Sequence, residues 1–218
     1  SCDGISPTST HHCRSFLLRS GLSSGQPAMV LLMMAGATCA VTFLGVPWYF
    51  GLFRSIQFTE TKMEAAVFVF VTHVGPYKHV GNIFAKLAPL LPKLPAGVQT
   101  AFIGLDSPQH VEASKLRSLC GLWLPVRLRS DVDGILQAIS AGAGLKMSVR
   151  EINAARAQHT FFPLRNQLSY MLGPMKVYSA AFTGLDAPPC GCVELYHSDQ
   201  IEYIFALENP EDYKWPDA

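Results

Sequence analysis

The sequence predicts an α+β domain made of two pseudo-symmetric strand–helix–strand–strand halves, preceded by one transmembrane helix. Three observations predict this fold class. No charged residue occurs between Arg19 and Arg54. After that stretch, short runs rich in valine and phenylalanine alternate with segments whose apolar residues recur every three or four positions, as in strands and helices. The order strand, helix, strand, strand then occurs twice along the chain.

Composition excludes several classes of protein. Of the 218 residues, 49% are hydrophobic and 15% are charged, which is typical of neither a disordered nor a solvating chain. The 17 basic and 16 acidic residues leave almost no positive field, so we expect no nucleic-acid partner. Six cysteines are too few for a disulfide scaffold.

Residues 27–54 form the predicted transmembrane helix. Their apolar core, 28–53, exceeds the roughly 20 residues that cross about 30 Å of hydrocarbon. A secretory signal peptide would have a shorter apolar region nearer the start of the chain. Small residues favour packing against other helices, and aromatic and basic residues favour the membrane interface. The packing candidates are Gly36, Ala40 and Gly45, and the interface candidates are Trp48, Tyr49 and Arg54.

The segments on either side of this helix are polar. Residues 1–26 form a predicted tail rich in serine, threonine and glycine, with Arg14 and Arg19 and one acid, Asp3. A chain beginning at Ser1 with such a tail would suit a processed organellar import substrate. Residues 55–64 are expected to be a linker. The charges do not indicate which way the helix crosses the membrane.

The first half of the predicted domain, which spans 65–212, begins with a buried strand at Ala65–His73. A turn at Gly75-Pro76 follows, and an apolar stripe predicts a helix at His79–Leu94 that prolines should kink or end. Two further strands are expected at Val98–Leu105 and Leu116–Leu124.

The second half follows a short predicted helix at Val132–Ser140. It should contain strands at Lys146–Asn153 and Ala155–Phe162, and a helix at Arg165–Ala181 that Gly173-Pro174 interrupts. The closing hairpin is expected at Cys192–Tyr196 and Ile201–Leu207, with a C-terminal tail at 213–218.

Two segments resemble a known family. The turn His73-Val74-Gly75-Pro76-Tyr77 and the closing hairpin, with its Val193-Glu194-Leu195-Tyr196 strand, are similar to those of GyrI-like domains in the SOUL/GyrI superfamily. The resemblance covers about residues 62–212. A membrane helix directly before the domain is also found in members that act as ER-phagy receptors. Residues 211–216 do not match the autophagy-binding motif of those receptors, so that role is not carried over.

The resemblance implies a ligand cleft lined by Glu194, Tyr196 and Tyr77. Residues two apart in a strand share a face, so Glu194 and Tyr196 should point the same way. A carboxylate in an apolar cleft would bind a cation or act as a general base. The alternative is that Glu194 simply faces solvent on an antiparallel sheet.

No metal or cofactor is expected. Cys190 and Cys192 are closely spaced, and even with Cys120 nearby a zinc site would need a fourth ligand. The tail residues Cys2, His11, His12 and Cys13 match no standard spacing. Neither a phosphate-binding glycine loop nor a nucleophile elbow is present in the sequence.

These observations together predict a non-catalytic, single-pass accessory subunit of an organellar membrane complex, with the mitochondrial inner membrane and a respiratory-chain type of complex expected first. Its partners would be the lipid bilayer and other membrane subunits. One alternative is a receptor or small-molecule-binding module anchored in the endoplasmic reticulum membrane. Another is a small hydrolase that uses Glu194.

Overall fold

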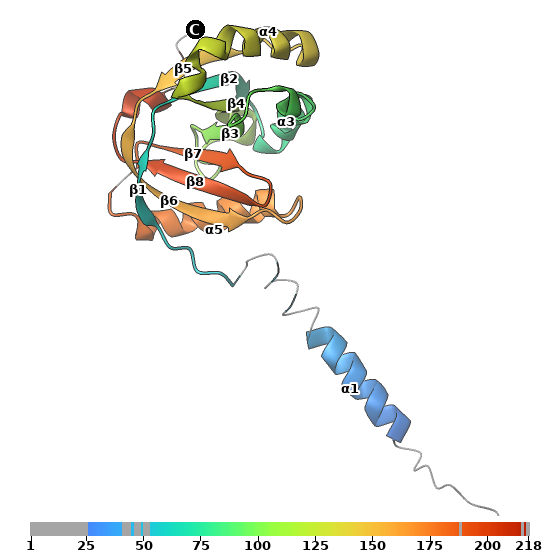
Figure 1. Cartoon of the computed structure of the whole chain (residues 1–218). Helices are drawn as coiled ribbons and strands as arrows, with labels where there is room; N and C mark the ends of the chain where they lie inside the picture. The colour runs from blue at the N-terminus through green and yellow to red at the C-terminus, as the bar shows by residue number, and fades with distance from the viewer. Residues whose placement is uncertain are drawn as a thin grey trace, which may run out of the picture. The chain divides into compact units, whose positions relative to one another are not determined.

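Eight antiparallel strands form one sheet in the computed structural model, which describes residues 26–40, 45, 49, 53–187, 189–214 and 216 (Figure 1). The strands are β1 (Thr59–Met63), β2 (Ala66–Val74), β3 (Gln99–Gly104), β4 (Arg117–Pro125), β5 (Ser148–Ile152), β6 (Ala155–Pro163), β7 (Gly191–Tyr196) and β8 (Gln200–Ala206). The α-helices that lie between these strands in the sequence are α3 (Gly81–Leu87), α4 (Val132–Ala143) and α5 (Ser169–Gly184).

The strand order has a near-symmetric form. It runs β1-β6-β8-β7-β3-β4-β2-β5, so β7 and β3 meet in the middle, and each half contributes three strands to its own side. The remaining strands exchange sides: β1 extends the second half by pairing with β6, and β5 extends the first half by pairing with β2. The predicted α+β class and its repeated strand–helix–strand–strand order agree with this arrangement.

The sheet curls around one hydrophobic core. Phe68 on β2 and Ile204 on β8 belong to the same buried cluster, although several strands separate them in the sheet. Trp123 on β4 and Tyr213 near the C-terminus join that cluster. Because residues from distant strands meet in one cluster, this face of the sheet is the inner side of the curl.

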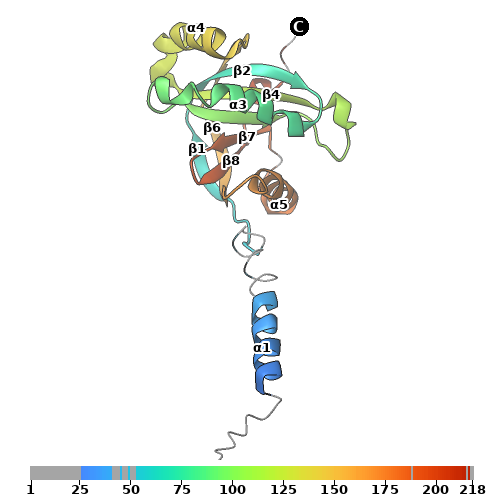
Figure 2. The same ribbon diagram turned by 90° about the vertical axis from the view of Figure 1, so that its right-hand side faces the viewer.

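Helices cover the other face, one set for each half (Figure 2). In the first half, Leu122 and Leu124 of β4 pack with Ile135 and Ile139 of α4, and partly buried residues of α3 complete the cluster. In the second half, Val177 of α5 packs with aromatic residues of the neighbouring strands. The amphipathic pattern of α4 therefore places its apolar stripe against the sheet.

Strand β1 corrects the prediction of a linker at 55–64. Residues 59–63 pair with β6 from Thr59 opposite His159 to Met63 opposite Ala155. Among the strand's residues only Met63 is buried, because β1 lies at the sheet edge with its polar side chains outward. A strand of this composition carries too little apolar alternation to be recognised from sequence.

Three further element boundaries can be compared with the prediction. The helix predicted at His79–Leu94 is reduced to α3, and the short 3-10 turn Leu91–Lys93 follows it after Pro89. Helix α5 instead continues through Pro174. The predicted C-terminal tail also begins too early, because the Tyr213 side chain is only 5% exposed and its hydroxyl faces Met63.

The N-terminal part of the chain forms a separate unit that ends at Gly45. Its described helix is α1 (Gln26–Ala40), whose apolar side chains between Met29 and Met34 are exposed. No helix within the described ranges is both long and apolar enough to span a bilayer. The rest of the predicted span, apart from Gly45, Tyr49, Phe53 and Arg54, lies outside the described residues, as does the tail 1–25.

Candidate ligand-binding site around Glu194

Glu194 lies on strand β7 in the middle of the sheet, and only 2% of its surface is exposed. Its neighbours on the two adjoining strands are Phe102 on β3 and Tyr203 on β8. Cys120 on β4 extends this row beyond Phe102. The alternative prediction, a solvent-facing Glu194, is wrong, because the carboxylate points to the sheet face that α3 and α5 cover.

Two tyrosine hydroxyls hold the carboxylate. Tyr178 on α5 donates to Oε1 over 2.8 Å, and Tyr196 on β7 donates to Oε2 over 2.8 Å. Burial raises the pKa of Glu194 to about 7, against an ordinary value of 4.5, and the two hydroxyl donors partly oppose that rise. Glu194 therefore changes charge near neutral pH. The causes of its pKa shift are burial and two tyrosine hydroxyls, and they include no cation.

Aromatic rings enclose the site from both halves of the domain. The Tyr196 ring meets Phe84 of α3 at 5.4 Å between ring centroids and Tyr170 of α5 at 5.7 Å. The Tyr178 ring meets Tyr203 edge-on at 6.0 Å. The rings of Phe84, Tyr170 and Tyr196 thus join α3 to α5.

Tyr203 contributes an unusual buried hydroxyl. The residue is fully buried, and within the described part of the chain its hydroxyl has no hydrogen-bond partner. Helix α5 passes very near it, because a Cβ added to Gly173 would lie 2.5 Å from this oxygen. Most buried polar atoms in proteins are hydrogen-bonded, so an orphaned donor beside a buried carboxylate calls for an explanation.

Tyr77 packs among the residues around the site, in the cluster that contains Phe102 and Tyr196. Its hydroxyl donates to the backbone oxygen of Asp106 over 2.6 Å and to that of Arg117 over 3.1 Å. Burial, as the main cause, raises the pKa of Tyr77 to about 12. Its ring packs edge-on against Phe102 at 5.3 Å, so it supports a neighbour of Glu194 and makes no hydrogen bond to the carboxylate in the described structure.

The cysteines of the domain form no ligand set. Cys120, Cys190 and Cys192 are free thiols, and no group of three potential metal ligands exists among the residues that the structure describes. Cys192 lies in the aromatic cluster under α5, whereas Cys120 lies in the cluster under α3. Burial raises the pKa of both thiols.

The residues predicted to pack against other helices or to lie at the membrane interface differ in exposure. Gly36 lies within α1 and is exposed, and Ala40 is the last residue of that helix. Tyr49 and Arg54 are exposed. Gly45 is half-buried, and Trp48 lies outside the described residues.

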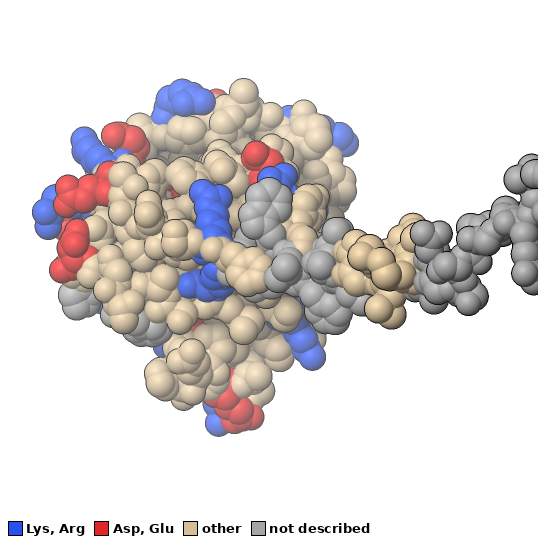
Figure 3. Space-filling model, turned by 90° about the horizontal axis from the view of Figure 1, so that it is seen from below, with Lys and Arg blue, Asp and Glu red and all other residues tan. Residues whose placement is uncertain are grey.

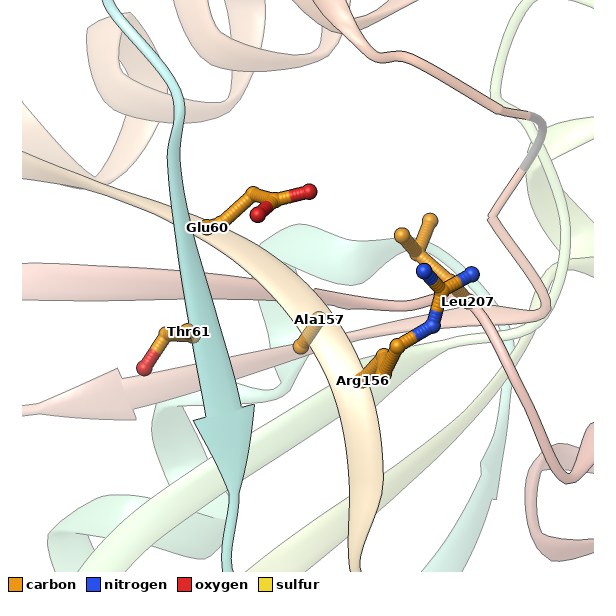
Figure 4. Close-up of a pocket in the computed structure, with 5 residues that line it drawn as sticks. All are labelled: Glu60, Thr61, Arg156, Ala157 and Leu207. Carbon is orange, nitrogen blue, oxygen red and sulfur yellow. The ribbon is translucent and has the colours of Figure 1, made fainter.

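Two surface cavities lie along the edge formed by β1 and β6. One, of about 280 Å³, is lined by Glu60, Thr61, Arg156, Ala157 and Leu207 (Figure 4). The other, of about 330 Å³, is lined by Arg54, Ser55, Gln57, Thr59, His159, Thr160 and Phe161. Neither cavity includes Glu194, Tyr196 or Tyr77. The site around Glu194 is therefore distinct from both cavities.

Sequence reasoning brought Glu194 and Tyr196 together but missed Tyr178, Phe102 and Tyr203. Tyr203 follows Glu202 in the closing hairpin, and only the pairing register of β7 and β8 places it opposite Glu194. Tyr178 belongs to a helix, and its contact depends on how α5 lies on the sheet. Neither relationship has a local signal in the sequence.

Comparisons with known proteins place few limits on this chain. No protein-family model and no curated protein matches it. Three solved structures illustrate the matches found in structural comparison. An integron cassette protein from Vibrio cholerae has a TM-score of 0.46 and 7% identity, covering 70% of this chain and 96% of its own. The EcmrR C-terminal domain has a TM-score of 0.45 and 9% identity, covering 71% and 98% respectively. SAV2435, solved with bound tetraphenylphosphonium, has a TM-score of 0.46 and 8% identity, covering 71% and 96%. Because these TM-scores are below 0.5, we assign no family from them.

Proposed function

We propose that residues 59–213 form a non-catalytic, GyrI-like binding module whose site around Glu194 takes an organic cation with aromatic character. The observation that carries this proposal is the buried carboxylate of Glu194, held by two tyrosine hydroxyls and surrounded by aromatic rings. The GyrI-like identity is supported by the turn before Tyr77 and the hairpin that contains Glu194. In that turn Gly75 has a φ of 135°, a conformation that glycine adopts readily.

Electrostatics favours a cationic ligand. A carboxylate that loses its proton in a low-dielectric site needs a compensating positive charge, and the described neighbours of Glu194 supply only hydroxyl donors. A ligand cation would form that ion pair. Tyrosine and phenylalanine faces also attract cations, at about 0.5–2 kcal/mol for each well-placed ring.

The unpartnered hydroxyl of Tyr203 supplies a second recognition element. It lies on the strand next to Glu194 and can donate to, or accept from, a polar atom of the ligand. A ligand that carries a polar atom near its charged centre would satisfy this hydroxyl and Glu194 together.

Entry to the site requires movement of aromatic side chains. The rings of Phe84, Tyr170 and Tyr196 connect α3 to α5, and the Tyr196 hydroxyl donates to the carboxylate. Helix α3 spans only Gly81–Leu87, and prolines follow it at positions 89 and 92. Outward displacement of this short helix would open the site with little loss of regular structure.

Calorimetric titration with tetraphenylphosphonium, a bulky aromatic cation, tests the proposal. We expect saturable binding to the full chain, weaker binding of a neutral aromatic compound of similar size, and loss of binding in Glu194→Gln. Glu64→Gln, which alters a carboxylate that is 80% exposed, is the matched control and should bind normally. Equal binding by Glu194→Gln and the unmodified chain would exclude Glu194 as the anchor.

Hydrolysis by Glu194 is the less favoured use of the same site. Each carboxylate oxygen already accepts one tyrosine hydrogen bond, so only its remaining lone pair could reach a water molecule, in a site where Glu194 is 2% exposed. Turnover of a small electrophile by the full chain, lost in Glu194→Gln, would establish the hydrolase.

Exposed side chains on α1 favour a second candidate function, that of a single-pass accessory subunit in an organellar membrane, first of all the mitochondrial inner membrane. The six consecutive apolar residues from Met29 to Met34 are each between 56% and 76% exposed. A contiguous apolar surface of this kind marks a binding partner or a membrane. Native-gel migration after extraction from membranes, followed by mass spectrometry, tests this role. Comigrating membrane subunits would support it, and a lone monomer would contradict it.

A further inference from the structure

Several exposed apolar side chains of the unit that begins at Val46 lie on helix α5 or beside it. Among its described residues, nine large hydrophobic side chains are exposed: three of them lie on α5, one lies just before it, and two are at positions 49 and 53. These six are Tyr49, Phe53, Leu168, Tyr170, Met171 and Met175. Met171 and Met175 are one helical turn apart, so they share a side of α5 that points away from the sheet.

Contacts place Tyr49 and Arg54 beside α5 and the residues just before it. The Arg165 guanidinium lies over the Tyr49 ring, 5.7 Å from its centroid, and the Lys176 ammonium donates to the backbone oxygen of Arg54 over 2.7 Å. The exposed apolar residues and these three basic residues therefore belong to one surface. We refer to it as the α5 face, made of Tyr49, Phe53, Arg54, Arg165, Leu168, Tyr170, Met171, Met175 and Lys176.

The charge of the α5 face has one sign. No acidic residue occurs between Arg165 and Leu185 or between Tyr49 and Gln57, so its three charged members are all basic. Figure 3 views the molecule from below, the side on which α5 lies in Figure 1, and shows blue side chains in an extensive uncharged area that has red side chains around its margins. Apolar residues combined with Lys and Arg, without acids, are typical of helices that lie in a membrane interface.

We propose that the α5 face lies in the interface of a bilayer containing anionic lipids. The apolar side chains would enter the boundary between headgroups and acyl chains, and the basic ones would reach lipid phosphates and carboxylates. The sequence supports a membrane over a protein as the occupant, because the charge-free stretch from Ser20 to Phe53 leads directly into this face. The inference rests on the membrane-anchored candidate above and is independent of ligand binding at Glu194.

A fluorophore that responds to polarity tests this placement in the full chain. In one protein it would be attached to the cysteine of Met171→Cys. In a second protein it would be attached to the cysteine of Val126→Cys, because Val126 is 52% exposed and lies in the turn before α4. In both proteins Cys2, Cys13 and Cys39 would be replaced by serine to limit labelling elsewhere. Each protein would be reconstituted in phosphatidylcholine vesicles with and without phosphatidylserine, some of them carrying brominated acyl chains.

We expect brominated lipids to quench the probe at position 171 and to leave the probe at position 126 unaffected. The quenching should be greater with phosphatidylserine, and Lys176→Gln should weaken that lipid preference about fivefold, since each basic residue near an anionic surface contributes about 1 kcal/mol. A vesicle-bound chain whose probe at 171 stays as aqueous as that at 126 overturns the inference and leaves the anchor intact. A chain that does not remain with vesicles overturns both.

Discussion

The hydroxyl of Tyr178 donates to Oε1 of Glu194 over 2.8 Å and so joins helix α5 to the central strand β7. This contact makes a nearly symmetric fold asymmetric. Glu194 of β7 pairs directly with Phe102 of β3 across the boundary between the two halves. The first half therefore has an apolar ring at the position opposite the carboxylate of the second half. The doubled architecture therefore contains a single central charge, and the α5 side supplies its helical donor.

Glu194→Gln should change how stability depends on pH. Burial raises the pKa of Glu194 from 4.5 to about 7, so the folded chain holds a proton between these values that the unfolded chain releases. The free energy of unfolding contributed by this group therefore falls as pH rises across that window and stays constant above it. Glutamine does not titrate, so the variant should gain up to about 3 kcal/mol relative to the unmodified chain between pH 5 and pH 8.

Urea denaturation of the full chain at several pH values would measure that gain. Glu64→Gln, at an exposed carboxylate, should show a much smaller change. A difference between Glu194→Gln and the unmodified chain that is the same at pH 5 and pH 8 would show that burial does not raise this pKa.

Tyr178→Phe should destabilise the chain more at high pH than at low pH. The variant removes one of two donors from a carboxylate that is charged above its pKa, and hydrogen bonds to charged groups contribute about 1.5–3 kcal/mol, against about 1 kcal/mol for neutral pairs. It should also raise the pKa of Glu194 further, because that hydroxyl lowers it. Tyr213→Phe is the matched control, since its hydroxyl donates to the Met63 sulfur, a weak acceptor, at 3.6 Å. Equal losses at pH 5 and pH 8 for Tyr178→Phe would argue against this role.

Most strands could be predicted from sequence because they are buried on both faces of a helix-covered, curled sheet. The run Ala65–His73 is nearly continuous in apolar residues, and the structure places β2 at Ala66–Val74. Strand β1 escaped prediction because only Met63 is buried and the pattern before it is polar. Its position depends on pairing with β6, whose partner residues lie about a hundred positions later in the chain.

The candidate site could be predicted only in part for a related reason. The two-residue period of a strand was enough to place Glu194 beside Tyr196. The strand pattern alone did not predict burial of the carboxylate, since a glutamate in an antiparallel strand ordinarily faces water. The contact from Tyr178 requires a particular rotation of α5 on the sheet, which long-range packing determines.

Tyr77→Phe should show whether the Tyr77 hydroxyl supports the fold or contacts the ligand. Its hydroxyl bonds to the backbone of Asp106, and its ring supports Phe102, so removing the hydroxyl should cost about 1 kcal/mol of stability. Binding of tetraphenylphosphonium should be unchanged within about twofold, because the hydroxyl makes no contact with Glu194 in the described structure. Denaturation and calorimetry on the same preparation would measure both. A large loss of affinity without loss of stability would assign Tyr77 to the ligand.

Gly173→Ala should disturb the site by adding a methyl group where α5 lies against the sheet. A methyl group there would lie 2.5 Å from the Tyr203 hydroxyl oxygen and 3.1 Å from the Phe162 ring, and both residues are fully buried. Overpacking of this kind costs about 1–3 kcal/mol. Tyr203→Phe removes the obstructing oxygen, so the double variant should recover much of that loss. Gly134→Ala, on α4 with open space around it, is the matched control and should be neutral or stabilising. Urea denaturation of these four variants and of the unmodified chain would test the coupling, and additive losses in the double variant would show that α5 does not approach Tyr203 this closely.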